Sequence, residues 1–268
     1  MSTSKHHTPN GNRLSRVILI GVLALLVGCQ RAVPPSGEGA IFEAVEAGDV
    51  NRVRQLLKTS PSVLNELDDF GFTPLMRAVA SMERTTAMIQ AFIDAGADVN
   101  AKTVEDYTAL HMLAGSMASP DSTATPEQIV KLLKDVGADL EVRQHWGWTP
   151  LMGAAVEGTI DELKAFVDAG ADVNKKFPLD TLPEFLGGRT TLMAVIAEPE
   201  KTKMLIDAGV DLRAVDDHGQ NVLEYAEAAL AEAAANPVDL KELGIDEPVE
   251  DDYGSRVKES MQRIKKVW

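Results

Sequence analysis

The stretch Gly147-Trp-Thr-Pro-Leu-Met-Gly-Ala-Ala-Val-Glu-Gly158, with its continuation to Asn174, decides the fold of this chain. Thr149 is followed by a proline, and this pair is typical of a helix start. The threonine hydroxyl can accept a hydrogen bond from the first turn, and proline fits there. Apolar residues then recur at helical spacing in two segments, and Gly170 suits the left-handed end of the second one. The stretch therefore predicts two short antiparallel helices followed by a turn.

Two phrases of this stretch recur along the chain. The first, Gly-x-Thr-x-Leu, occurs at 71–75, 147–151 and 188–192, with weaker copies at 106–110 and 219–223. The second, Ala-Gly-Ala-Asp-Val-Asn, occurs at 95–100 and 169–174, with variants at 136–140 and 208–212. The phrases alternate, and Gly137 and Gly170 are 33 residues apart. One unit cannot bury its own apolar face, so successive units must stack.

These phrases and their period resemble the ankyrin repeat. The resemblance extends over residues 38–235, because the segment from Ile41 to Gly48 aligns with the first helix of the stretch quoted above. It implies an all-α fold: an ankyrin-repeat solenoid of helix pairs with β-hairpin fingers, about five repeats long. Residues 236–268 are expected to form an acidic segment and a C-terminal capping helix. Apolar residues recur at helical spacing at its end, at Val257, Met261, Ile264 and Trp268.

Two of the units are longer than the others. In the third unit, polar and small residues around 116–126 are inserted between the two helices. In the fourth unit, the apolar segment 177–186 lengthens the finger. This finger is either a loop that binds a partner or a lid that folds over the protein's own surface, and the sequence leaves both alternatives open.

The N-terminus has the layout of a secretory signal peptide. Residues 1–16 carry three basic residues and no acidic one, and an apolar run of 11 residues follows at 17–27. That run is too short to cross a bilayer as a helix. It ends in Leu26-Val-Gly-Cys29, which resembles the bacterial lipobox. The resemblance implies cleavage before Cys29 and lipidation (palmitate or a similar acyl group) of this residue.

The expected organisation is a lipoprotein signal peptide at 1–28, the lipidated cysteine and a linker at 29–37, and then the repeats. Gln30, rather than aspartate, follows the cysteine. By resemblance to bacterial sorting, this favours an outer-membrane lipoprotein that faces the periplasm, with the inner membrane as the alternative.

Composition narrows the classes of partner. The formal net charge is −15, and removal of residues 1–28 makes it −18. Such a chain lacks the cationic surface that nucleic acids require, and its charge suits a basic partner protein. The single cysteine excludes a disulfide framework and a cysteine-based zinc site. No cofactor, metal or small-molecule substrate is expected.

No group of residues points to catalysis. His111 follows Thr-x-Leu, where the ankyrin resemblance implies a histidine that bonds to the neighbouring backbone. The acidic pairs Asp68-Asp69 and Asp216-Asp217 fall in finger turns, where aspartate is favoured for the geometry of the turn. We therefore expect no catalytic residue.

Binding is the better-supported class of function. In the ankyrin family, finger tips and first helices line the surface that holds partner proteins. The partner-binding residues predicted by position are Phe70, Phe72, Tyr107, Trp146, Trp148, Phe177, Leu179, Phe185 and Arg189. Aromatic side chains are enriched at interface hot spots. The alternative for Phe72 and Tyr107 is packing against the next finger. Trp146 and the long fourth finger are expected to share one patch.

The sequence thus predicts a membrane-anchored periplasmic protein that binds an unidentified partner protein as an adaptor or scaffold. The alternative is an inhibitor, such as an immunity protein that neutralises a periplasmic toxin or enzyme. An enzyme is a distant third.

Overall fold

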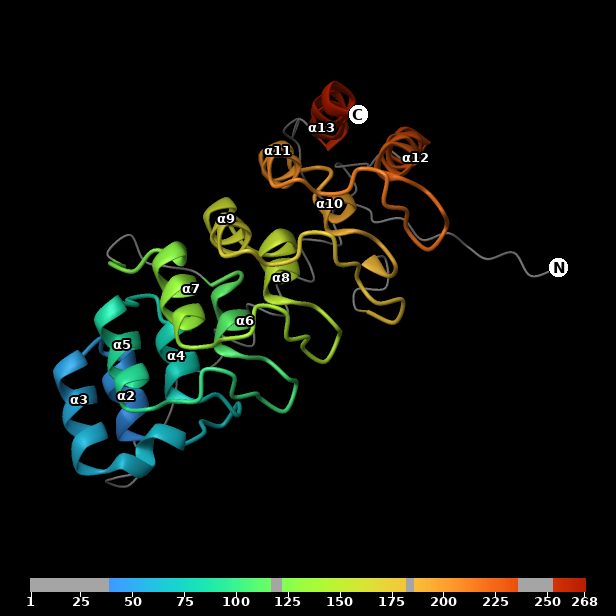
Figure 1. Ribbon diagram of the computed structural model, residues 1–268. Helices are drawn as coiled ribbons and strands as arrows, with labels where there is room; N and C mark the ends of the chain where they lie inside the picture. The colour runs from blue at the N-terminus through green and yellow to red at the C-terminus, as the bar shows by residue number, and fades with distance from the viewer. Residues whose placement is uncertain (1–38, 117–121, 182–185, 236–252) are drawn as a thin grey trace, which may run out of the picture. The chain divides into compact units, whose positions relative to one another are not determined.

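Figure 1 shows the computed structural model of the chain, which describes residues 39–116, 122–181, 186–235 and 253–268. The predicted signal peptide and linker, Cys29, Phe185 and the acidic segment at 236–252 lie outside these residues. The described residues form two compact units, one ending at Asp172 and the other beginning at Val173. Each unit is described by itself.

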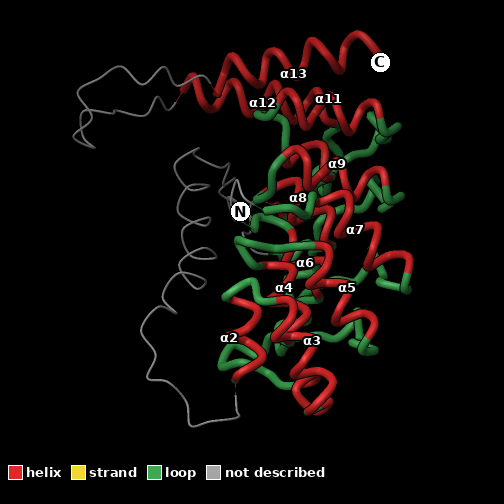
Figure 2. The backbone as a smooth tube through the Cα atoms, turned by 90° about the vertical axis from the view of Figure 1, so that its left-hand side faces the viewer, coloured by secondary structure: helices red, strands yellow, loops and turns green. Residues whose placement is uncertain are grey.

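The unit that ends at Asp172 is built from pairs of short helices. They are α2 (Ala40–Glu46) and α3 (Val50–Thr59), α4 (Pro74–Ala80) and α5 (Thr86–Asp94), α6 (Ala109–Leu113) and α7 (Pro126–Asp135), and α8 (Pro150–Val156) and α9 (Ile160–Asp168). A 3-10 turn, η1 (Pro61–Asn65), follows α3. The first helices of the pairs pack in one row and the second helices in another (Figure 2). This confirms the predicted stack of helix pairs.

The unit that begins at Val173 contains α10 (Thr191–Ala194), α11 (Pro199–Asp207), α12 (Val222–Ala235) and α13 (Tyr253–Val267). Helix α12 packs on α10, and α13 packs on both α11 and α12. The predicted capping helix is therefore the second helix of a sixth pair. Its apolar stripe of Val257, Met261 and Ile264 is buried as expected, whereas Trp268 is exposed.

The recurring Gly-x-Thr-x-Leu phrase starts the first helices as predicted. The hydroxyls of Thr73, Thr149 and Thr190 each accept a hydrogen bond from the backbone N–H three residues later, at 3.3–3.4 Å. These bonds satisfy donors that a helix leaves unpaired at its start. The leucine of the phrase is buried at positions 75, 110, 151 and 192. The second helix of the fourth unit ends at Asp168, and Gly170 just after it has a φ of 87° and is left-handed as predicted.

Between units the chain forms fingers: finger one (66–72), finger two (101–107), finger three (142–148), finger four (175–189) and finger five (214–220). Four of them are closed by a backbone N–H to C=O bond across four residues, at 2.9–3.1 Å, which begins at Asp68, Thr103, Gln144 or Asp216. Among the described residues only isolated β-bridges occur, Lys176 with Thr190 and Val215 with Asn221. These four fingers are therefore tight turns, and among the described residues the predicted β-hairpins are reduced to the two bridges.

A second set of hydrogen bonds joins the loop that follows each second helix to the equivalent loop of the next unit. The side-chain oxygen of Asn100 accepts the N–H of Asp139 at 2.9 Å, and that of Glu141 accepts the N–H of Asp172 at 2.8 Å. In the other compact unit, Asn174 accepts the N–H of Asp211 at 2.7 Å. These bonds, which we name rungs, pair backbone donors that would otherwise need water.

Candidate protein-binding surface

Large apolar side chains are exposed on the first three fingers. Val104, at the tip of finger two, is 90% exposed, and Phe70 on finger one and Trp146 on finger three are 47% and 41% exposed. Leu67, at the base of finger one, is also exposed. We name these four side chains the fingertip surface. Apolar side chains that gather on successive loops of one stack mark a contact site for another molecule.

Fingers two and three are tied to each other. The backbone N–H of His145 donates to the carbonyl oxygen of Glu105 at 2.9 Å, which joins the two tips. Behind the tips, the amide of Gln144 lies 3.5 Å from the Tyr107 hydroxyl. These contacts hold Val104 and Trp146 in a fixed relation, so a partner that binds them orders little additional structure.

Finger one is stiffened by an aromatic cluster. The rings of Phe70 and Phe72 stack with centroids 6.2 Å apart, and the guanidinium of Arg77 lies over both, 5.4 and 4.9 Å from the centroids. Arg77 also forms an ion pair with Asp68. Phe72 is half-buried in this cluster, whereas Phe70 keeps an open face. Of the two, Phe70 is the better placed for a partner.

Tyr107 is half-buried beside His111, edge to face, with ring centroids 5.7 Å apart. Burial, together with the nearby carboxylates of Glu157 and Glu105, raises the pKa of Tyr107 to about 12. The predicted role of His111 is confirmed: its Nε2 lies 3.1 Å from the carbonyl oxygen of Trp148 in the next unit. Tyr107 is thus a packed residue behind the tips of fingers two and three.

The two tryptophans of finger three have different surroundings. Trp146 is exposed at the tip, whereas Trp148 is only 4% exposed and belongs to the core. The prediction that Trp148 contacts a partner is therefore wrong for this conformation, because a partner cannot reach a side chain packed between units. Trp148 acts instead through its backbone, which accepts a bond from His111.

Finger four is folded back on itself. Phe177 is only 2% exposed, and its N–H donates to the carbonyl of Arg189 at 2.9 Å. The prediction of Phe177 as a contact residue is wrong for the same reason as that of Trp148. Leu179 remains 71% exposed, and Phe185 lies outside the described residues. Because fingers three and four fall in different compact units, the patch shared with Trp146 stays a prediction.

Arg189 is half-buried and fixed by the last helix pair. Its guanidinium lies 4.6 Å from the ring centroid of Tyr225 and donates to the Tyr225 hydroxyl at 2.8 Å. This stacking orients Arg189 within its own compact unit. Arg189 is therefore a packed residue that is only partly accessible to solvent.

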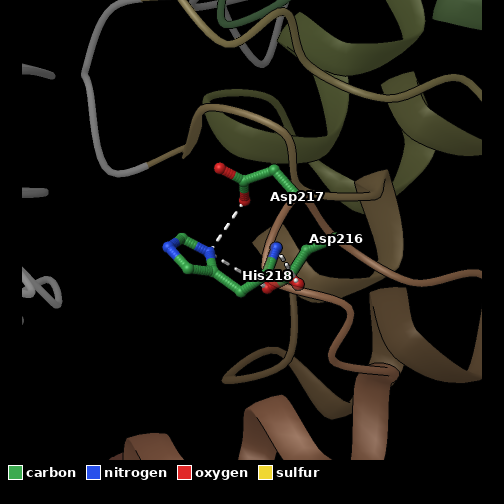
Figure 3. A group of neighbouring side chains, drawn as sticks. All are labelled: Asp216, Asp217 and His218. Carbon is green, nitrogen blue, oxygen red and sulfur yellow. Dashed lines mark hydrogen bonds and ion pairs between the residues drawn. The ribbon is translucent and has the colours of Figure 1, made fainter.

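One group in finger five has the chemistry of a metal site. Carboxylate oxygens of Asp216 and Asp217 and the Nδ1 of His218 lie within 4.8 Å of one another (Figure 3). His218 Nδ1 is 2.9 Å from Asp217 Oδ1, and Asp216 Oδ1 accepts the N–H groups of His218 and Gln220, each at 2.9 Å. The finger itself therefore accounts for these contacts, and Asp216 is a turn residue as predicted.

A buried polar cluster holds the insertion of the third unit. Arg84 donates to the hydroxyl of Ser116, which lies 3.5 Å from Glu162 Oε1, and Ser122 donates to the Arg84 carbonyl at 3.1 Å. Burial lowers the pKa of Arg84 and raises that of Glu162. Arg84 thus holds two residues of the insertion around 116–126, Ser116 through its side chain and Ser122 through its carbonyl oxygen. Sequence analysis missed this cluster, because nothing in the local pattern marks Arg84 as buried.

Comparisons with known proteins agree with this geometry. The family model described as ankyrin repeats (3 copies) matches residues 18–103, 41–144 and 79–177. An ankyrin repeat domain from Acinetobacter baumannii AYE is 21% identical with a TM-score of 0.58, over 85% of this chain and 97% of that one. A chain in the structure of a predatory endopeptidase from Bdellovibrio bacteriovorus in complex with an immunity protein is 24% identical, with a TM-score of 0.53, over 74% of this chain and 95% of that one.

The chain is also similar to the ankyrin repeat protein nuc-2 of Neurospora crassa, with 28% identity over 159 residues. The match covers 47% of this chain and 14% of nuc-2, so the chain spans a small part of that relative's length.

Capped short helices in pairs, joined by fingers that carry exposed apolar residues, define a helical-repeat protein. The family model covers more than half of the chain, and the chain belongs to the ankyrin-repeat family. Ankyrin repeats are protein–protein interaction modules. Across the described residues, each helix is too short or too polar to cross a bilayer.

Proposed function

We propose that this protein is an adaptor that binds a partner protein through the fingertip surface while a lipid anchor holds it at a membrane. The observation that carries the binding role is the exposure of Val104 and Trp146 on two fingers whose backbones are bonded to each other. Burying such apolar area contributes about 25 cal/mol per Å². The fixed register of the two fingers lowers the entropy cost of association.

Anchoring is proposed from the sequence of the N-terminus, Leu26-Val-Gly-Cys29. A diacylated cysteine binds stably to a bilayer, because each buried methylene contributes about 0.8 kcal/mol. In a bacterial host fed an alkyne analogue of palmitate, the wild-type chain should take up label and Cys29→Ser should not. An unlabelled wild type would remove the anchor and leave the binding role intact.

A second candidate function is that of an immunity protein, in which the bound partner is a toxin or enzyme. The specific observation is the fold similarity to a chain from the endopeptidase and immunity protein complex. Adaptor and inhibitor differ in what happens to the partner: an inhibitor abolishes the partner's activity at equimolar ratio, and an adaptor leaves it unchanged.

Photocrosslinking tests the binding surface. A benzoylphenylalanine at Val104 should crosslink to one partner protein in envelope extracts, and Trp146→Ala in the same chain should abolish that product. Val136, an exposed valine at the end of α7, is the matched control position. Equal crosslinking from Val104 and Val136, or a product unaffected by Trp146→Ala, would show that the fingertip surface is not the site.

A further inference from the structure

Carboxylates stand beside the exposed apolar residues of the first two fingers. Glu66 precedes Leu67 on finger one, and Glu105 follows Val104 at the tip of finger two. Among the described residues, the side chains of Glu66 and Glu105 form no ion pair, whereas many other acidic groups of the chain do. Finger two thus presents an apolar group and an unpaired negative charge together at its tip, and finger one presents such a pair at its base.

The cations of the same region are already engaged. Arg77 is paired with Asp68 and lies over the rings of Phe70 and Phe72. Lys102 lies 3.3 Å from Asp106 on finger two, and Arg143 donates to the carbonyl of Gly147 on finger three. Within the described part of the chain, these pairs leave the side chains of Glu66 and Glu105 without a cationic partner.

A third carboxylate stands at the end of the helix that follows finger three. Glu157, an exposed residue directly after α8, has the pKa of its carboxyl group raised by desolvation from the atoms around it. The fields of Glu157 and Glu105 both reach the Tyr107 phenol. A partly desolvated carboxylate without a cationic partner is costly, and a cation brought close to it is worth more than one in open water. The exposed ring of Trp146, the residue after the His145 N–H that bonds to Glu105, offers a further favourable surface for a cation.

From this juxtaposition we propose that the fingertip surface binds a basic segment of the partner protein, with lysine or arginine side chains directed to Glu105 and apolar residues packed on Val104 and Trp146. This inference rests on the proposed function and names the chemistry of its partner. Complementary charges at the rim speed association and impose register, and salt screens them. Apolar contact at the centre sets the lifetime of the complex.

Two fluorescein-labelled synthetic peptides test this chemistry: one carries lysine and arginine spaced by leucine, and the other has glutamate at every basic position. Each is titrated into the full chain in detergent and followed by anisotropy. The basic peptide should bind at least roughly tenfold more tightly than the acidic one, and its affinity should fall roughly tenfold between about 50 and 300 mM salt.

The decisive variant is Glu105→Lys, with Asp94→Lys as its control. Both change the net charge by the same amount, but Asp94 ends α5 on the second-helix row, where a cation suits the helix terminus. Glu105→Lys should weaken the basic peptide roughly tenfold, and Asp94→Lys by less than about twofold. Equal losses from the two variants, or equal affinity for the two peptides, would overturn the inference.

Failure of this inference can be told apart from failure of the proposed function. A partner crosslinked at Val104, lost with Trp146→Ala but unaffected by salt and by Glu105→Lys, would keep the binding surface and refute its basic ligand. Absence of any specific product at Val104 would refute the binding surface itself.

Discussion

The imidazole of His111 bridges two consecutive units: its Nδ1 lies 2.9 Å from the Thr108 hydroxyl and its Nε2 lies 3.1 Å from the Trp148 carbonyl. The backbone N–H of Thr108 also donates to Nδ1, at 3.2 Å, so Nδ1 is an acceptor and Nε2 carries the proton. A single neutral tautomer therefore satisfies all three contacts.

This arrangement predicts a loss of stability in mild acid. Burial lowers the pKa of His111 to about 4, against an ordinary value near 6.5. The pKa of His111 is lower in the folded chain than in the unfolded chain. The stabilisation from its neutral imidazole is therefore complete above pH 6.5 and is lost as the pH falls from 6.5 to 4. The loss approaches about 1.4 kcal/mol per pH unit and totals about 3 kcal/mol. Urea denaturation of wild type and His111→Gln between pH 7.5 and 4.5 measures it. Parallel pH profiles of the two proteins would contradict the assignment.

Leu151 should be a major contributor to the core of the fourth unit. It is fully buried in α8, so Leu151→Ala should lower the free energy of unfolding by about 2–5 kcal/mol. Leu179→Ala is the matched control, because that leucine is exposed and its truncation should change the unfolding midpoint by less than about 0.5 kcal/mol. Comparable losses in the two variants would mean that finger four packs elsewhere in solution.

Removal of two buried hydroxyl groups should change the free energy of unfolding in opposite directions. Ser260 on α13 is fully buried and its Oγ has no hydrogen-bond partner in the described part of the chain. Ser260→Ala should therefore raise the free energy of unfolding by up to about 1 kcal/mol. Thr202 on α11 is equally buried, but its hydroxyl donates to the Val195 carbonyl at 3.1 Å. Thr202→Val should cost about 1 kcal/mol, and thermal denaturation distinguishes the two signs.

Two glycines at the same position of the repeat should tolerate alanine differently. Gly188 and Gly219 have φ values of 72° and 77°, so a side chain costs about 1–2 kcal/mol at either. A Cβ at Gly219 would meet open space, whereas one at Gly188 would lie 2.6 Å from the Cβ of Asp217. Gly188→Ala should therefore destabilise more than Gly219→Ala in chemical denaturation. Equal costs would place Asp217 away from finger four.

The repeated backbone could be predicted from sequence because each of its features is local. Threonine caps, left-handed glycines and buried leucines lie within a few residues of the structure that they specify. Even Asp106, which replaces the glycine of finger two, has a φ of 61° and keeps the left-handed conformation of the phrase. The predicted C-terminal capping helix is also present as α13, which packs on α11 and α12.

The binding surface was less predictable because the fingers have no periodicity. Trp146 and Trp148 stand two residues apart in one turn, yet only the first is exposed. The N–H of Gln144 bonds to the carbonyl of Trp148 and closes the turn. The ring of Trp148 is therefore buried among the helix pairs. Val104, the most exposed apolar side chain of the fingertip surface, is not among the predicted contact residues, because a single valine in a turn carries no pattern that distinguishes it.

The rungs between loops have an evolutionary consequence. Each rung takes its acceptor from the side chain of Asn100, Glu141 or Asn174 and its donor from a main-chain amide of the following unit. Every residue except proline carries that amide, so a newly inserted or duplicated unit needs no compensating substitution in its neighbour to join the array. Lineages can therefore lengthen, shorten or shuffle such a protein by whole-unit recombination while its exposed fingers diversify independently.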